Sequence, residues 1–433
     1  MPNTEAALRA GKALVDGRSG ILQRVTLSPS PPDEPAIYNT TVERNSPDEL
    51  TDGRSFDPTE GGCSLDPEQA VVSAIGEAIE RYCASIYRRS ELVHASFDDL
   101  EHALDPNRVV NFSTAQIASD GFNRVIYTHG DELGWVEGVD ETTGEETMLP
   151  GQLVYLTYEE PSDPFIRETI STGLAAGMTR SGAKTRAVLE VVERDAFMIY
   201  YLTRTPLPRI DVSGCGGDIQ TITDRLDQAG LDWHVLDART DHDVPTVVSV
   251  IIDESTEPAV TVAASAARTI RDAVRGALEE AIQTRLYQRY HLENGAESVD
   301  LRTVATEDID QDTRLLGWAH SNARTKLSFW TEADRIVPLS QIRSESNIDD
   351  SRSVIDTVST EWDLYSVNIT TRDVAQAGFV VVRAIAPAAQ PLYLREVNRY
   401  WDESRLRTVP DAVGHPTDAP TDEPLTAYPH PFP

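Results

Sequence analysis

The sequence predicts an α+β fold, a mixed α/β sheet with packed helices, between an N-terminal extension and a Pro-rich C-terminal tail. The 433 residues are 40% hydrophobic, which is enough for a sizeable core. Apolar residues recur every three or four positions in three long stretches, which predicts helices. Short apolar runs between and after them predict strands, and their order lacks a regular βαβ alternation. The predicted strands cover 153–158, 233–236, 246–252, 260–263, 364–370 and 379–386.

The first long helix is predicted to begin at Asp66-Pro67, where a residue that caps helix N-termini precedes a proline suited to the first turn. Its apolar stripe consists of Val71, Ala74, Ile75, Ala78, Ile79 and Tyr82. The other two long helices are predicted over 184–201 and 269–290. A shorter helical pattern covers 6–15.

Composition divides the chain into three parts. Residues 1–55 contain the short helix, a Pro-rich turn at 29–32 and room for a strand or two, so they read as an extension. Residues 56–405 hold the long helices and most strands and form the main domain. Residues 406–433 are rich in Pro and Asp, and from Thr408 onward we expect an extended tail with little helix or strand.

The charge balance excludes some classes of function. The chain has 71 Asp+Glu against 38 Lys+Arg, a net charge of −33, which makes nucleic acid a poor partner. Only Lys12, Lys184 and Lys326 are lysines, and excess surface acid with so little lysine is typical of halophilic proteins. No apolar run is long enough for a membrane span and no signal-peptide pattern occurs, so we expect a soluble, cytoplasmic protein. The three cysteines form no CxxC pair and are expected to be reduced.

The first candidate site motif is Ser73-x3-Glu77-x2-Glu80-Arg81. On a helix these positions share one face, offset from the apolar stripe, so a hydroxyl, two carboxylates and a guanidinium project together. Taken alone, a solvated acidic face explains this motif equally well.

The second motif, Glu190-x2-Glu193-Arg194-Asp195, lies in a helix that is otherwise apolar. Buried carboxylates need a cation or a donor, and a divalent metal is a common way to gather several of them. A third helix adds Glu279, Glu280, Gln283 and Arg285. Three helices with carboxylates and guanidinium groups would be one way to hold Mg-ATP without a phosphate loop. Neither GxxxxGK[ST] nor GxGxxG occurs, so the usual glycine-cradled nucleotide sites are excluded.

Three segments resemble the YcaO family in order and spacing: SAIGEAIERY at 73–82, STGLAAG at 171–177 followed by AVLEVVERDA at 187–196, and ALEEAIQTR at 277–285. The resemblance covers about residues 60–290 and continues more loosely through 378–387. It implies that 56–405 is a YcaO-like ATP-binding domain with Mg²⁺ held on helix carboxylates. It also implies that peptide amide oxygens are activated by phosphorylation.

The final residues 429–433, Pro-His-Pro-Phe-Pro, look like the PxPxP end of the azoline-forming cyclodehydratases of this family, although a merely Pro-rich disordered end is the alternative. The resemblance implies a thiazoline or oxazoline product made from Cys, Ser or Thr of a precursor peptide. It assigns Mg²⁺ and phosphates to Glu77, Glu80, Glu190 and Glu193, and ATP to Ser73, Arg81, Arg194 and Gln283. The carboxylate of Pro433 would accept a proton in catalysis.

Some positions depart from the family pattern. Thr172 and Met178 stand where Asn is common, Gly182 where Glu is nearly constant, and Cys63 near the place of a common lysine. The loss of that carboxylate leaves open a catalytically weakened scaffold that binds precursor peptide for another enzyme. ATP-dependent peptide thioamidation, with sulfide as nucleophile, is a further alternative, which the PxPxP end disfavours.

The resemblance also implies partners. The substrate would be a ribosomally made precursor peptide, as in bacteriocin biosynthesis. Because residues 1–55 offer no candidate leader-binding domain, we expect a separate ThiF-like partner protein. Related proteins are commonly homodimers.

Overall fold

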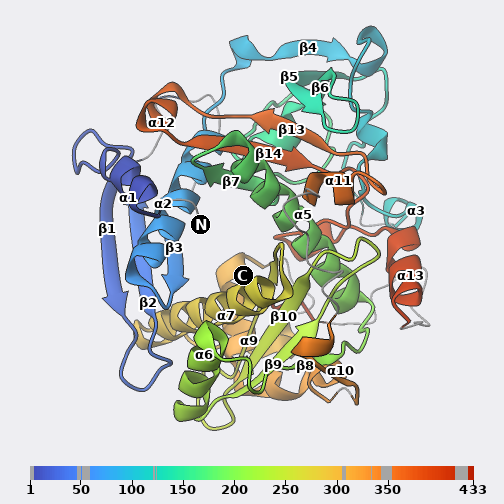
Figure 1. The fold of residues 1–433 in the computed structure, drawn as a ribbon. Helices are drawn as coiled ribbons and strands as arrows, with labels where there is room; N and C mark the ends of the chain where they lie inside the picture. The colour runs from blue at the N-terminus through green and yellow to red at the C-terminus, as the bar shows by residue number, and fades with distance from the viewer. Residues whose placement is uncertain are drawn as a thin grey trace. The chain divides into compact units, whose positions relative to one another are not determined.

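The computed structural model describes residues 4–45, 50, 59–119, 122, 124–304, 309–332, 334–342, 354–414 and 428–433. The chain forms two compact units (Figure 1). Unit 1 is Met1–Ser28, Tyr38–Val191 and Ile355–Ala389, and unit 2 is Pro29–Ile37, Val192–Val354 and Gln390–Pro433.

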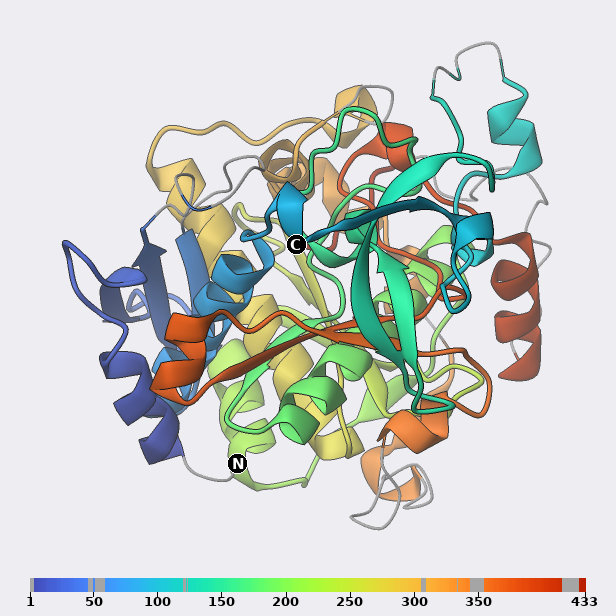
Figure 2. The same cartoon turned by 90° about the horizontal axis from the view of Figure 1, so that it is seen from above.

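Unit 1 contains a six-stranded antiparallel sheet in the order β4-β5-β13-β14-β7, with β6 paired to β5. Figure 2 shows the long twisted pair of β5 and β6. The strands are β4 (Val93–Ser96), β5 (Glu132–Asp140), β6 (Glu146–Pro150), β7 (Leu174–Gly177), β13 (Tyr365–Asn368) and β14 (Val380–Ile385). Short helices connect them: α3 (Thr114–Ile117), α4 (Gly151–Val154), α11 (Val354–Val358) and α12 (Arg372–Ala377).

A second, three-stranded sheet in unit 1 supports the helix that carries the first motif. Its order is β1 (Leu22–Pro29), β2 (Tyr38–Arg44) and β3 (Thr59–Ser64), and α1 (Thr4–Lys12) and α2 (Pro67–Ala84) pack beside it (Figure 1). The Asp66 side chain caps α2 by accepting a hydrogen bond from the Gln69 N–H at 2.9 Å. Gly62 lets α2 approach β3, because a Cβ there would lie 2.4 Å from the Ala74 nitrogen.

Unit 2 contains a five-stranded sheet in the order β11-β10-β9-β8-β12, in which only the β8–β12 pair is parallel among the described strands. The strands are β8 (Arg209–Asp211), β9 (Asp232–Asp237), β10 (Thr246–Ile252), β11 (Val260–Ala266) and β12 (Ile336–Pro338). Helix α7 (Ile270–Glu293) packs on β10 and β11. The other helices are α6 (Gly217–Gln228), α8 (Leu301–Val304), α9 (Gln311–Ala319), α10 (Ser328–Thr331) and α13 (Glu403–Ala412). Helix α5 (Arg180–Leu202) passes from unit 1 to unit 2 after Val191.

The predicted fold class is confirmed, and the three long helices lie within a few residues of their predicted bounds. Two local predictions are wrong. The predicted strand at 153–158 is partly the short helix α4, since a short apolar run cannot distinguish a strand from a buried helical turn. The extended tail predicted from Thr408, with little helix or strand, instead begins inside α13, which Asp402 caps by accepting from the Ser404 and Arg405 N–H groups. The predicted domain boundaries at 55/56 and 405/406 stay a prediction.

Within the described residues, no helix combines the length and apolar character that a membrane crossing requires.

Candidate functional site

The carboxylates of the first motif lie on α2 in unit 1, together with Arg81. Glu77 accepts a hydrogen bond from Arg81 Nη2 through Oε1 (3.2 Å), and from the Gly61 N–H through Oε2 (3.3 Å). Ser73 lies one turn earlier and is exposed, with its Oγ accepting from Gln69 Nε2 at 3.2 Å. The acidic face of α2 therefore contacts β3 through the Gly61 N–H.

Glu80 connects α2 to the strand that follows the STG segment. Its Oε1 accepts a hydrogen bond from the Ala176 N–H of β7 at 2.6 Å. The Ala176 carbonyl accepts from Arg186 of α5. The backbone of Ala176 therefore contacts a carboxylate through its N–H and a guanidinium through its carbonyl.

Glu190, from the part of α5 that belongs to unit 1, reaches the turn before β7. Its Oε2 accepts from the Gly173 N–H at 3.2 Å. Gly173 has φ +87°, and a Cβ there would lie 2.3 Å from the Ala384 carbonyl oxygen. The glycine of the STG segment is therefore needed for the close approach of this turn to β14 and for its left-handed backbone.

Unit 1 thus gathers carboxylates around Arg81. Burial lowers the pKa of Arg81, but Glu77, Glu190, Glu60 and Glu80 outweigh it, so that its pKa is raised. Burial raises the pKa of Glu80, the Ala176 N–H lowers it, and Glu190 and Glu77 raise it further, to about 8. Burial and the neighbouring carboxylates thus disfavour the charged form of Glu80, a cost that a bound cation would offset.

Glu193 and Arg194, the second glutamate and the arginine of the α5 motif, belong to unit 2. Glu193 is buried, and its Oε2 accepts from the Ala266 N–H at the end of β11 at 3.1 Å. Arg194 Nε lies 3.3 Å from Glu193 Oε1, and its guanidinium carbon lies 4.0 Å from the centre of the Phe432 ring. Arg194 therefore connects the α5 motif to the C-terminal segment.

The C-terminal segment 428–433 is packed into unit 2. Tyr201 Oη donates to the carbonyls of Tyr428 and Pro429, each at 3.0 Å, and Trp318 Nε1 donates to the Pro429 carbonyl at 3.0 Å. Phe432 is fully buried, with its ring 4.6 Å from that of Phe197. The alternative of a disordered Pro-rich end therefore does not hold for these residues.

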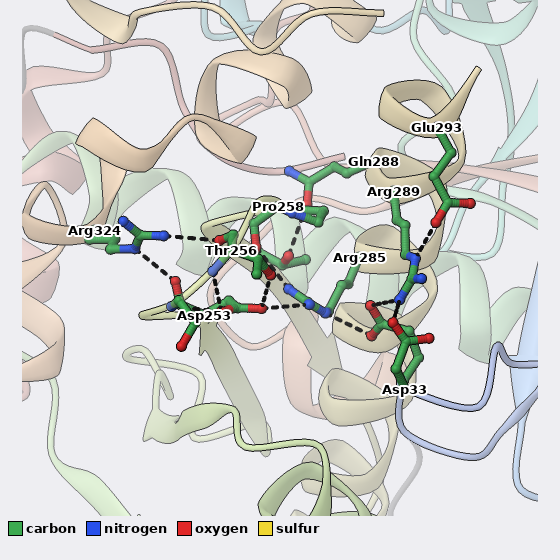
Figure 3. Close-up of polar contacts among 12 residues, drawn as sticks. Asp33, Asp253, Thr256, Pro258, Arg285, Gln288, Arg289, Glu293 and Arg324 are labelled. Carbon is green, nitrogen blue, oxygen red and sulfur yellow. Dashed lines mark hydrogen bonds and ion pairs between the residues drawn. The ribbon is translucent and has the colours of Figure 1, made fainter. Parts of the chain in front are cut away.

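The third helix contributes less than its sequence suggests. Gln283 is partly buried on α7, in unit 2. Arg285, which we expected near phosphates, instead donates to three protein acceptors: Glu34 Oε2 at 2.8 Å, Asp253 Oδ2 at 2.9 Å and the Pro258 carbonyl at 2.8 Å (Figure 3). Each of its three nitrogens donates to a protein acceptor, so this guanidinium serves as a structural group.

Three of the four departures from the family pattern, Gly182, Met178 and Thr172, lie between the turn before β7 and the first turn of α5. Gly182, in the first turn of α5, donates its N–H to Thr179 Oγ1 at 3.1 Å. Met178 is partly buried and packs against the apolar core of unit 1. Thr172, in the turn before β7, is partly buried.

The motifs did not reveal the backbone partners of the glutamates, which are the N–H groups of Gly61, Gly173, Ala176 and Ala266. They also missed Arg186 and the buried Glu60 beside Glu77. The glycines at 61 and 173 were the only visible signals, since glycine marks close backbone approach.

The carboxylates of unit 1 fit magnesium only if other ligands complete its coordination shell. Among the described residues, no three His, Cys, Asp or Glu side chains are gathered closely enough to hold a metal by themselves. Mg²⁺ is commonly held by one or two carboxylates and completes its shell with water and substrate phosphates. The carboxylates around Arg81 therefore fit a Mg²⁺ ion that binds together with a nucleotide, and not a closed protein metal site.

Solved structures share this fold. A heterocyclase in complex with substrate and cofactor superposes with a TM-score of 0.79 at 19% identity, over 99% of this chain and 57% of that one. YcaO from Methanopyrus kandleri, bound with AMPPCP and Mg²⁺, gives 0.62 at 19% identity, over 93% and 94%. The E. coli microcin synthetase McbBCD complex with pro-MccB17 bound gives 0.58 at 14% identity, over 84% and 87%.

Two curated relatives match part of the sequence. An uncharacterized protein of Methanothermobacter thermautotrophicus is 30% identical over 187 residues, 43% of this chain and 45% of that protein. An uncharacterized protein in the tfuA 3' region of Rhizobium leguminosarum bv. trifolii is 30% identical over 200 residues, 44% of each chain. The match thus spans less than half the length of either relative.

The family model for the YcaO cyclodehydratase, described as ATP- and Mg²⁺-binding, matches residues 61–390. That range holds both ExxER motifs, the STG turn and α7. It confirms the predicted resemblance, and ATP and Mg²⁺ as the cofactors of the family. The chain belongs to the YcaO family.

Proposed function

We propose that this chain is an ATP- and Mg²⁺-dependent peptide cyclodehydratase that forms thiazoline or oxazoline rings in a ribosomally made precursor peptide. One observation carries the proposal: within unit 1, Glu77, Glu80 and Glu190 are held around Arg81 by backbone N–H groups, in a chain of the YcaO family. Such a cluster has the charge and the oxygen donors to bind Mg²⁺ with a triphosphate.

Each predicted site residue has a role in this proposal. Glu77, Glu80, Glu190 and Glu193 would hold magnesium together with the phosphates, and the metal would neutralise charge on the triphosphate. Arg81 and Arg194 orient the phosphates, and Ser73 and Gln283 contact the nucleotide. The carboxylate of Pro433 accepts a proton from the substrate, and the packing of Phe432 under Arg194 supports a role for this segment.

The chemistry solves a leaving-group problem. A Cys, Ser or Thr side chain attacks the preceding amide carbonyl, loses its proton to a base, and leaves a tetrahedral oxyanion. That oxygen takes the γ-phosphoryl group of ATP, and ADP is released. The C–O bond then breaks, phosphate departs with the former amide oxygen, and loss of the amide proton completes the ring. The arginines stabilise the charge that develops on the oxyanion and the transferred phosphoryl group, and bound Mg²⁺ would supply further charge neutralisation.

The substrate and partner follow from the same proposal. A precursor peptide, as in bacteriocin biosynthesis, supplies the Cys, Ser or Thr residues, and a separate ThiF-like protein binds its leader. The acidic, lysine-poor composition indicates a halophilic source, so assays belong in concentrated salt.

The decisive experiment follows the amide oxygen. A precursor peptide labelled with ¹⁸O at the reacting amide is incubated with the chain, the partner protein and Mg-ATP. We expect the label in the released phosphate and the loss of one water mass per ring. Label in phosphate only when sulfide is added, with sulfur replacing oxygen in the peptide, would instead show thioamidation.

The tail and the scaffold alternative are tested alongside. Deleting 429–433, or appending a few residues after Pro433, is expected to abolish ring formation while the protein remains folded. Unchanged cyclisation by the extended form would refute the proposed role of the Pro433 carboxylate. If a folded sample binds no AMPPCP with Mg²⁺, the departures at Thr172, Met178 and Gly182 have removed nucleotide binding, and the chain is a scaffold.

A further inference from the structure

Glu60 of β3 is a buried carboxylate that the sequence motifs did not predict. It is 6% exposed, and its Oε1 accepts from Arg44 Nε of the neighbouring strand at 2.8 Å. Both side chains are almost fully buried. Among the described residues, its second oxygen, Oε2, has no hydrogen-bond partner although it is buried. A buried carboxylate oxygen left without a donor is costly, so this atom indicates a missing ligand.

Strand geometry directs Glu60 toward the acidic face of α2. Side chains two residues apart in a strand share a face, and Gly62, two residues on, lies against the α2 backbone. The next residue, Gly61, donates its N–H to Glu77. The charges of Glu77 and Arg81 both act on the Glu60 carboxyl.

We propose that Glu60 is a further residue of the magnesium site, with Oε2 as an acceptor for the cation or a water bound to it, and with Arg44 as the residue that positions it. The inference rests on the proposed function of this site and deepens it by extending the site from two helices to the three-stranded sheet. Mg²⁺ keeps much of its water, so a carboxylate beside it can act through that shell.

The test is calorimetric titration of the full chain with Mg²⁺ in the presence of AMPPCP. Glu60→Gln keeps the size of the side chain and removes its charge. We expect Mg²⁺ affinity to fall at least tenfold, while AMPPCP affinity without metal is unchanged or higher. The matched control is Glu43→Gln on β2, which removes the same charge from a residue paired with Arg24 and should leave both affinities unchanged.

Because Glu60→Gln leaves Arg44 buried without its carboxylate, the double variant Arg44→Met/Glu60→Met is measured as well. It removes the pair without leaving a lone charge, and we expect a folded protein with the same tenfold loss of Mg²⁺ affinity. Wild-type Mg²⁺ affinity in either folded variant would overturn the inference. If Glu80→Gln loses Mg²⁺ while Glu60→Gln keeps it, only this inference fails. If the wild type binds no Mg²⁺ with AMPPCP, the proposed function fails with it.

Discussion

Two clusters of carboxylates and guanidinium groups, one in each unit, are built from the same residue types but are satisfied to different degrees. In unit 2, Arg285 donates to Glu34, Asp253 and the Pro258 carbonyl, and Arg289 donates to Glu34 (Figure 3). In unit 1, Glu60 and Glu80 each have one hydrogen bond to a described residue, and Glu60 keeps a buried oxygen without a partner.

The pKa values express the same difference. Burial raises the pKa of Asp253, but hydrogen bonds from Thr256 and Ser255 and the charge of Arg285 outweigh it and lower the pKa. At Glu80 burial and neighbouring carboxylates prevail, and the pKa rises to about 8. The unit 2 cluster is complete and serves stability. The unit 1 cluster is incomplete, because a buried oxygen of Glu60 has no donor among the described residues, and we propose that it binds a cation.

The largest expected effect is a loss of stability of the metal-free protein as pH rises. The folded state keeps a proton on Glu80 up to about pH 8, whereas an unfolded glutamate loses it near its model value of 4.5. Stability therefore falls between these pH values, by at most about 5 kcal/mol at ~1.36 kcal/mol per pKa unit. The measurement is thermal unfolding from pH 5 to 8 in a chelator, comparing the wild type with Glu80→Gln. Parallel pH profiles would show that Glu80 is not desolvated.

Breaking the complete cluster should cost nearly as much. Arg285→Met leaves Glu34 and Asp253 without their buried guanidinium, and we expect a loss of about 3–5 kcal/mol in the free energy of unfolding. Chemical denaturation measures it. Arg302→Met, which removes a solvent-exposed ion pair with Asp300, is the control and should leave the denaturation midpoint unchanged. Equal midpoints for the two variants would contradict a structural role for Arg285.

Removing one carboxylate of the incomplete cluster should affect binding and not folding. Glu190→Gln keeps an acceptor for the Gly173 N–H and removes one charge. We expect Mg²⁺ affinity with AMPPCP to fall about 10–100-fold, or about 1.4–3 kcal/mol, with an unchanged unfolding temperature in chelator. Calorimetry and thermal unfolding on the same samples check both. A lower unfolding temperature with unchanged affinity would place Glu190 among the structural residues.

The smallest expected effect is a gain in Mg²⁺ affinity. Gly182→Glu returns the carboxylate that the family usually has, and a Cβ there would lie 3.0 Å from Thr179 Oγ1, which a small side-chain rotation relieves. We expect Mg²⁺ affinity to rise about threefold to tenfold, roughly 1 kcal/mol. Gly182→Gln adds a side chain of the same size without the charge, so it separates the effect of the charge from that of the size. If both variants bind Mg²⁺ like the wild type, position 182 does not face the metal.

The long elements could be predicted because they depend on local information. Asp66 before Pro67 set the start of α2, and the helix predicted over 269–290 matches α7, which Thr269 caps. The strand at 246–252 matched β10 because its run of Val and Ile is buried throughout. Predictions failed where the local signal was ambiguous, in the short apolar run at 153–158 and at Thr408 in α13.

The sequence alone determined the helices, the carboxylates on their faces and the family, because caps, periodicity and motif spacing act over a few residues. Only the tertiary structure decided which charges have partners. Arg81 and Arg285 both follow glutamates on apolar helices, yet Arg285 meets Glu34 from 251 residues away, while Arg81 lies among glutamates from β3, α2 and α5. Partner atoms so distant in the chain are brought together only by folding, and they determine whether a buried charge stabilises the protein or is available to a ligand.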